Sequence, residues 1–143
     1  KTRTIAEHFQ WVLSIDRLKI ARRLNEQRPQ QLPPLNICVQ VNVSREPSKS
    51  GIVQQALHEF VEQLVELPRL KLRGLMAIPL KTTEEITQRA MFNELRRMFD
   101  DLNQHGYQLD TLSMGMSADL EAAVKEGSNL LRIGTGIFGA RNQ

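Results

Sequence analysis

The sequence predicts an α/β domain with a parallel sheet that helices cover. Short runs rich in Val, Ile and Leu alternate with longer segments of helical periodicity, and these runs are apolar throughout rather than alternating. No Gly/Ser linker, repeat or low-complexity stretch among the 143 residues marks a domain boundary. Two architectures fit this pattern equally well: a doubly wound sheet, or part of a (β/α)8 barrel, which takes about 250 residues when complete.

In the first half of the chain, apolar residues recur at helical spacing in two long segments and gather without interruption in two shorter ones. Residues 30–34, with Pro33 and Pro34, break the helical pattern that precedes them, and Pro47 and Gly51 mark a polar turn. We therefore expect, in order, a helix over residues 1–9, a strand over 11–15, a helix over 16–27, a strand over 35–43 and a helix over about 53–66.

The second half continues the alternation. Thr82 or Thr83 is a candidate N-cap for a long helix with Glu84 and Glu85 in its first turn, and Gly127 ends a later helix. We expect a strand over residues 70–78, a helix to about 104, a strand over 111–114, a helix from 117–119 to 127, a strand over 130–133 and a short helical tail over 137–140. These five strand-helix units, at about 30 residues each, would form five-eighths of a barrel.

Composition excludes several classes of protein. The 41% of hydrophobic and 24% of charged residues are ordinary for a globular domain and exclude extensive disorder. No apolar run approaches the roughly 20 residues of a membrane span, and no signal peptide is recognisable. The net charge of +3 is mild, and no aromatic residues are interleaved with the basic ones, which disfavours a nucleic-acid surface. Cys38 is the only cysteine, so a disulfide within the chain is excluded; we expect a core position and the cytoplasm.

Two glycine-rich turns follow consecutive expected strands and lead into expected helices. They are Ser-Met-Gly-Met-Ser at residues 113–117 and Arg-Ile-Gly-Thr-Gly at residues 132–136. Backbone N–H groups at such a turn point out of the strand end, glycine lets an anion approach closely, and the hydroxyls of Ser117 and Thr135 add donors. The pair of turns predicts a phosphate site. The alternative is that both hydroxyls are helix caps and the glycines only form tight turns.

Arg132 lies between Leu131 and Ile133, where an unpaired guanidinium would be costly to bury. We expect an acceptor for it at the strand end. A structural ion pair is the alternative role.

Other residues are weaker candidates. His8, His58 and His105 have no partner at the sequence spacing of metal ligands or of a catalytic triad, which disfavours both. Asn42 could reach the mouth of the site, although an asparagine at a strand end is more often a turn former. Met76 and Met114 are expected in the core or in a pocket wall.

Several segments together resemble the YggS/PROSC family of pyridoxal 5′-phosphate homeostasis proteins. They are the two glycine-rich turns with their flanks (113–119 and 132–139), Val-Asn-Val-Ser at 41–44, Lys-Ser-Gly at 49–51, and Leu-Arg-Gly-Leu-Met-Ala-Ile-Pro at 72–79. Their order and spacing also resemble the family's. The resemblance implies a (β/α)8 barrel related to the N-terminal domain of alanine racemase, of which this chain would cover about strands 4 to 8 as a single partial-barrel domain.

The resemblance also implies a site. It would place Met116, Ser117, Gly134 and Thr135 around the phosphate of pyridoxal 5′-phosphate, with Arg132 facing the pyridine nitrogen. An arginine there keeps the ring a poor electron sink, which suits a carrier or regulator of the cofactor better than an enzyme. We therefore expect a non-catalytic cofactor-binding protein, with no catalytic residues and no metal.

One feature departs from the family. The lysine that forms the Schiff base lies upstream of the segment matched here, and none of the lysines in this chain occupies the matching motif. We expect a fragment that retains the phosphate-binding half, holds the cofactor weakly, and self-associates through exposed barrel edges. Two alternatives stay open. One is part of a fold-type III pyridoxal-phosphate racemase or decarboxylase, which would need a catalytic Tyr or Cys from a second domain, since Tyr107 stands alone in a polar segment and Cys38 lies inside a strand. The other is an engineered half-barrel without a ligand.

Overall fold

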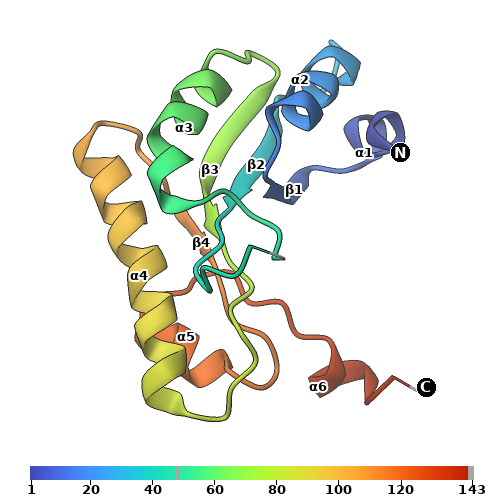
Figure 1. Cartoon of the computed structure of the whole chain (residues 1–143). Coiled ribbons are helices and arrows are strands. Elements are labelled where there is room, and N and C mark those ends of the chain that lie inside the picture. The colour runs from blue at the N-terminus through green and yellow to red at the C-terminus, as the bar shows by residue number, and fades with distance from the viewer. Residues whose placement is uncertain (48, 142–143) are drawn as a thin grey trace.

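A four-stranded parallel sheet forms the centre of the computed structural model, which describes residues 1–47 and 49–141. The strands pair in chain order (Figure 1): β1 (Trp11–Ile15), β2 (Leu35–Gln40), β3 (Leu70–Met76) and β4 (Thr111–Ser113). A doubly wound sheet reverses its strand order at a switch point, whereas neighbouring strands of a barrel wall follow one another. The strand order therefore favours the barrel architecture over the doubly wound one.

In the part of the chain that the structure describes, seven helical segments connect or flank the strands. Their bounds are α1 (Thr2–His8), α2 (Leu18–Gln27), the 3-10 helix η1 (Gln54–Ala56), α3 (Leu57–Val65), α4 (Glu85–Gln104), α5 (Leu120–Lys125) and α6 (Thr135–Phe138). The helix expected from residue 53 is split into η1 and α3, and the helix expected from residues 117–119 begins at Leu120. Within the described residues, no helix combines the length and apolar character needed to cross a bilayer.

The two faces of the sheet differ. Ile37, Val39 and Leu75 belong to one hydrophobic core together with buried helix residues such as Phe92 and Leu95. Because side chains alternate along a strand, Cys38 lies on the opposite face, the one that lines the interior of a barrel. Polar residues occupy that opposite face as well. The pairing of β2 with β3 shifts register between Leu72 and Gly74, so Arg73 also lies on this face. There it donates to Asp110 and Asn36, and its guanidinium stacks over Trp11.

The strand expected over residues 130–133 does not form, and this prediction is wrong. The segment lies beside β4, and two backbone bonds connect it there, from the Asn129 N–H to the Leu112 carbonyl and from the Arg132 N–H to the Gly115 carbonyl. Between them, side chains make the contacts that further ladder bonds would make. The Leu112 N–H donates to Asn129 Oδ1, and the Ser128 hydroxyl lies within hydrogen-bonding distance of the backbone of Met114. The Ser113 hydroxyl in turn donates to the carbonyl of Leu130. One edge of the sheet is therefore covered by these residues, which leaves β1 as the open edge in the described part of the chain.

Candidate functional site

Two glycine-rich loops meet beyond the carboxyl end of β4, as the sequence predicted. The backbone N–H of Gly136 donates to the Ser117 hydroxyl oxygen over 2.9 Å. A second hydrogen bond joins the two loops: the Arg132 N–H donates to the carbonyl of Gly115 over 3.0 Å. The two turns thus form one structure rather than two independent ones.

The first loop depends on Gly115. Its φ is +98°, a conformation that favours glycine, and a Cβ there would lie 2.5 Å from Cβ of Ala123 and 2.9 Å from Cδ2 of Leu131. The Asp119 carboxylate then accepts the Met116 N–H over 2.7 Å and holds the rest of the loop. Asp119 is also the N-cap residue of α5, so Ser117 does not cap that helix.

The second loop ends in the short helix α6. Gly134 occupies the N-cap position, and its carbonyl accepts the N–H groups of Ile137 and Phe138. Thr135 is the first helical residue and not the cap, so the simple capping alternative fails for both predicted hydroxyls. The backbone N–H groups of Ser117, Ala118, Gly134 and Thr135 have no acceptor among residues 1–47 and 49–141.

The loops frame a hollow of about 600 Å³. Four of the five predicted cofactor-binding residues line it: Met116, Ser117, Gly134 and Thr135. Lys81 and Arg141 line it as well, and together with Asp119 they give it a net positive charge. A volume of this size accommodates a small cofactor. Because the carboxyl ends of neighbouring parallel strands share one edge of a sheet, the position of Lys81 after β3 was a usable signal that the sequence reasoning missed.

Arg132 does not line the hollow; it lies next to the ends of β3 and β4. One of its terminal nitrogens donates to the Ser113 hydroxyl over 2.6 Å and to the Ser113 carbonyl over 3.0 Å, and the other donates to the carbonyl of Ala77 over 2.9 Å. The expected acceptor is thus confirmed, whereas no carboxylate pairs with Arg132 in the described part of the chain. Partial burial lowers the pKa of the guanidinium, and the Asp119 charge opposes that shift. An arginine so placed stays protonated.

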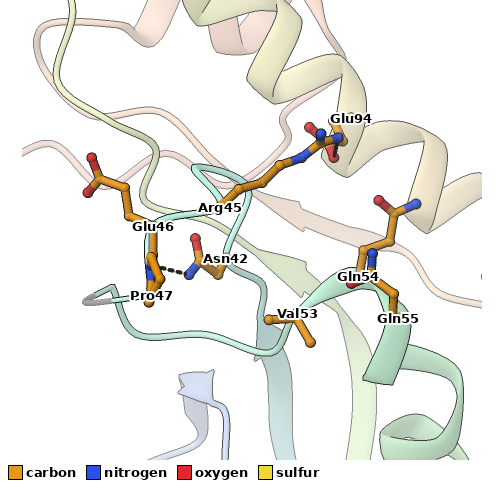
Figure 2. Close-up of a pocket in the computed structure, with 8 residues that line it drawn as sticks. All are labelled: Asn42, Arg45, Glu46, Pro47, Val53, Gln54, Gln55 and Glu94. Atoms are coloured by element: carbon orange, nitrogen blue, oxygen red, sulfur yellow. Dashed lines mark hydrogen bonds and ion pairs between the residues drawn. The ribbon is translucent and has the colours of Figure 1, made fainter.

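Asn42 is a turn former, the alternative that the sequence left open. Its side-chain amide donates to the carbonyls of Glu46 and Lys49, and its oxygen accepts the Ser44 hydroxyl. Figure 2 shows Asn42 beside a second hollow of about 430 Å³, over which Arg45 reaches to Glu94 on α4. That arginine is paired with Glu94 at 2.9 Å, so the second hollow is less suited to an anion than the first.

The remaining candidates are two methionines, the cysteine and the histidines. Met76, Met114 and Cys38 are buried, as expected of core residues. Burial raises the pKa of the Cys38 thiol to about 12. His58 and His105 converge on Asp101, an arrangement that the histidine spacing did not predict. His58 reaches the other two residues because α3 lies beside α4. Only the four-residue spacing of Asp101 and His105 was visible in the sequence.

Comparison with known proteins supplies independent information. The sequence matches the family described as "Alanine racemase, N-terminal domain" over residues 1–142. Over 142 residues it is 61% identical to a pyridoxal phosphate homeostasis protein of Pseudomonas aeruginosa and 52% identical to one of Escherichia coli K12. Both matches cover 99% of this chain, and they cover 60% and 61% of the relatives, so the chain spans about three-fifths of their length.

Solved structures show the same fold. PipY of Synechococcus elongatus PCC7942, determined with PLP bound, superposes with a TM-score of 0.86 at 35% identity, covering 96% of this chain and 65% of that one. Alanine racemase from Corynebacterium glutamicum gives a TM-score of 0.68 at 17% identity, covering 92% of this chain and 36% of that one. The second likeness concerns the fold alone.

Proposed function

Because the chain belongs to the alanine racemase N-terminal domain family, we propose that it binds the phosphate of pyridoxal 5′-phosphate and serves cofactor homeostasis without catalysing a reaction. The main support within the structure is the bond from Gly136 to Ser117, which joins two donor-rich loops around one hollow. Relatives that are named as homeostasis proteins, and a neighbour solved with PLP, agree with this proposal.

The donor set fits a phosphate dianion. The Ser117 oxygen accepts from Gly136, which leaves its hydroxyl hydrogen to donate to a ligand. The Thr135 hydroxyl and the backbone N–H groups of Ser117, Ala118, Gly134 and Thr135 add further donors, and Lys81 and Arg141 add positive charge. Hydrogen bonds to a charged group contribute about 1.5–3 kcal/mol each before ordering costs. We assign the phosphate to Ser117, Gly134 and Thr135, with Met116 in the wall.

Arg132 is the residue that argues against catalysis. Bound pyridoxal phosphate supplies an electron sink whose strength depends on the proton at its pyridine nitrogen. A guanidinium donates hydrogen bonds but accepts none, so it cannot stabilise a protonated pyridine nitrogen as a carboxylate would. We assign Arg132 to the side of that nitrogen. Ser113 and Ala77 hold its guanidinium at the ends of β3 and β4, next to the hollow that would take the phosphate.

The two alternatives have less support. For a racemase or decarboxylase, the candidate acid–base residues within this chain are poorly placed: the Cys38 thiol is buried with a raised pKa, and Tyr107 packs against the hydrophobic core. A half-barrel without a ligand would be expected to fill the predicted site with its own side chains. Instead, the loops leave a hollow of about 600 Å³.

Equilibrium dialysis with pyridoxal 5′-phosphate tests the proposal. We expect saturable binding that Ser117→Ala and Thr135→Val each weaken by roughly 10- to 100-fold, the effect of losing one charge-assisted bond of about 1.5–3 kcal/mol. Thr4→Val, an exposed threonine on α1, is the matched control and should bind normally. Pyridoxal, which lacks the phosphate, should bind much more weakly. Equal affinity for both compounds, or unchanged binding by the Ser117 and Thr135 variants, would refute the assignment.

A further inference from the structure

A cluster on the outer surface of the helices is independent of the cofactor hollow. We propose that His58, Asp101 and His105 bind one divalent transition-metal ion, with Zn²⁺ the candidate that best matches the donor set. His58 belongs to the first turn of α3, Asp101 to the last turns of α4, and His105 is the C-cap residue of α4. Figure 1 shows α3 and α4 side by side, which is how residues 43 and 47 positions apart in the sequence come together.

The distances suit a shared ion. His58 Nε2 lies 2.6 Å from Asp101 Oδ2, and the His105 ring also lies beside this carboxylate, with Nδ1 3.7 Å from Oδ1. The potential ligand atoms of the three residues all lie within 4.8 Å of one another. Ligand atoms of tetrahedral zinc are about 3.3 Å apart, given metal–ligand bonds of about 2.0–2.1 Å. Small side-chain rotations are therefore enough to place all three groups on one ion.

The backbone beneath the ligands is well fixed. Leu57 and Met98 are buried core residues next to the ligand positions, and Leu102 is buried immediately after Asp101. The carbonyl of Asp101 accepts the Nδ1–H of His105 over 2.8 Å, which orients the ring and leaves Nε2 as the atom that can bind the ion. Such outer contacts from a backbone carbonyl typically orient the histidines of metal sites.

The ligands are accessible from solvent. The exposed fractions of the side chains are 44% for His58, 49% for Asp101 and 58% for His105. A hollow of about 520 Å³ borders His58 and Asp101, with Arg97 among its lining residues. A hydrated ion can therefore reach the cluster and keep water in its remaining coordination positions.

The donor set selects the class of metal. Two imidazoles with one carboxylate favour zinc and its neighbours in the first transition row, whereas magnesium and calcium prefer oxygen ligands alone. The single thiol, Cys38, is buried on the sheet and is not a competing ligand at this surface. None of the three residues lines the hollow assigned to the cofactor phosphate. Failure of either proposal would thus leave the other intact.

Isothermal titration of the protein with Zn²⁺ tests the site, with Mg²⁺ as the comparison ion. We expect one Zn²⁺ per chain, affinity reduced by more than about tenfold in both His58→Ala and His105→Ala, and no saturable Mg²⁺ binding. His8→Ala is the matched control, since His8 lies 3.9 Å from the Glu7 carboxylate but belongs to no cluster of three such ligands among the described residues. This variant should bind Zn²⁺ as the unsubstituted protein does.

Thermal unfolding gives a second readout. An ion that joins α3 to α4 stabilises the folded state, so Zn²⁺ should raise Tm in the unsubstituted protein and in His8→Ala, but not in His105→Ala. Circular dichroism of each variant establishes that it is folded, which is expected because the substituted side chains are partly exposed. Absence of stoichiometric Zn²⁺ binding, or binding that survives both cluster substitutions, would overturn the proposal.

Discussion

Replacing Gly115 by alanine should destabilise the protein by about 2–4 kcal/mol. The residue has φ +98°, and forcing a residue with a side chain into the left-handed region costs roughly 1–2 kcal/mol. The new methyl group would also lie 2.5 Å from Cβ of Ala123, which is fully buried and leaves no room. Overpacking of this kind costs about 1–3 kcal/mol, and reduced entropy of the unfolded chain offsets part of the total.

Gly106→Ala is the matched control. Gly106 has nearly the same φ, +94°, but nothing lies within 4 Å of the position that a Cβ would take. This variant should therefore show only the conformational cost, about 1 kcal/mol. The difference between the two variants isolates the packing of the loop after β4 against α5.

Urea unfolding followed by circular dichroism measures both free energies of unfolding. A loss for Gly115→Ala that matches the loss for Gly106→Ala within about 0.5 kcal/mol would refute the packing argument. It would show that the loop carrying Met116 and Ser117 adapts freely, and the preformed hollow would lose its structural basis.

Three further predictions concern the sheet. Cys38 should resist thiol reagents at pH 8 until the protein unfolds, because its thiol is buried with a pKa of about 12; rapid labelling of the native protein would contradict this. Arg73 lowers the pKa of Asp110, so the stability that this ion pair adds is present above the unfolded pKa of about 3.9 and is lost as pH falls through the lower folded value. Asp110→Asn should cost about 0.5–1 kcal/mol at pH 7, since the pair is partly exposed, and the cost should shrink in acid unfolding curves; a pH-independent cost would be the contrary result. The open edge of β1 should cause concentration-dependent association in sedimentation velocity, whereas a monomer at every concentration would exclude this.

The sequence predicted most of the fold because hydrophobic periodicity is a local property. The strand over residues 11–15 matches β1, and the long helix ending at residue 104 matches the end of α4. The strand over residues 130–133 was not predictable in this way. Its composition suits a strand, but the ladder positions on β4 are taken by the side chains of Ser128 and Asn129, and only the folded arrangement brings them there.

The part of the candidate site that lies on the two glycine-rich loops was predictable from the sequence. Ser117 and Thr135 stood out because glycine-rich turns after consecutive strands meet at one edge of a sheet. Lys81, Arg141 and the cluster around Asp101 have no comparable local pattern, since each depends on segments that meet only after folding. The charge of the hollow and the proposed metal site therefore required the structure.

The most direct test of the central claim is a ¹⁵N–¹H NMR titration of the protein with pyridoxal 5′-phosphate. We predict that the largest shift changes occur at the backbone N–H groups of Ser117, Ala118, Gly134 and Thr135, which have no protein acceptor among the described residues, and that inorganic phosphate perturbs the same set. Changes centred instead on the hollow between Asn42 and Glu94, or no saturable changes at all, would contradict the account.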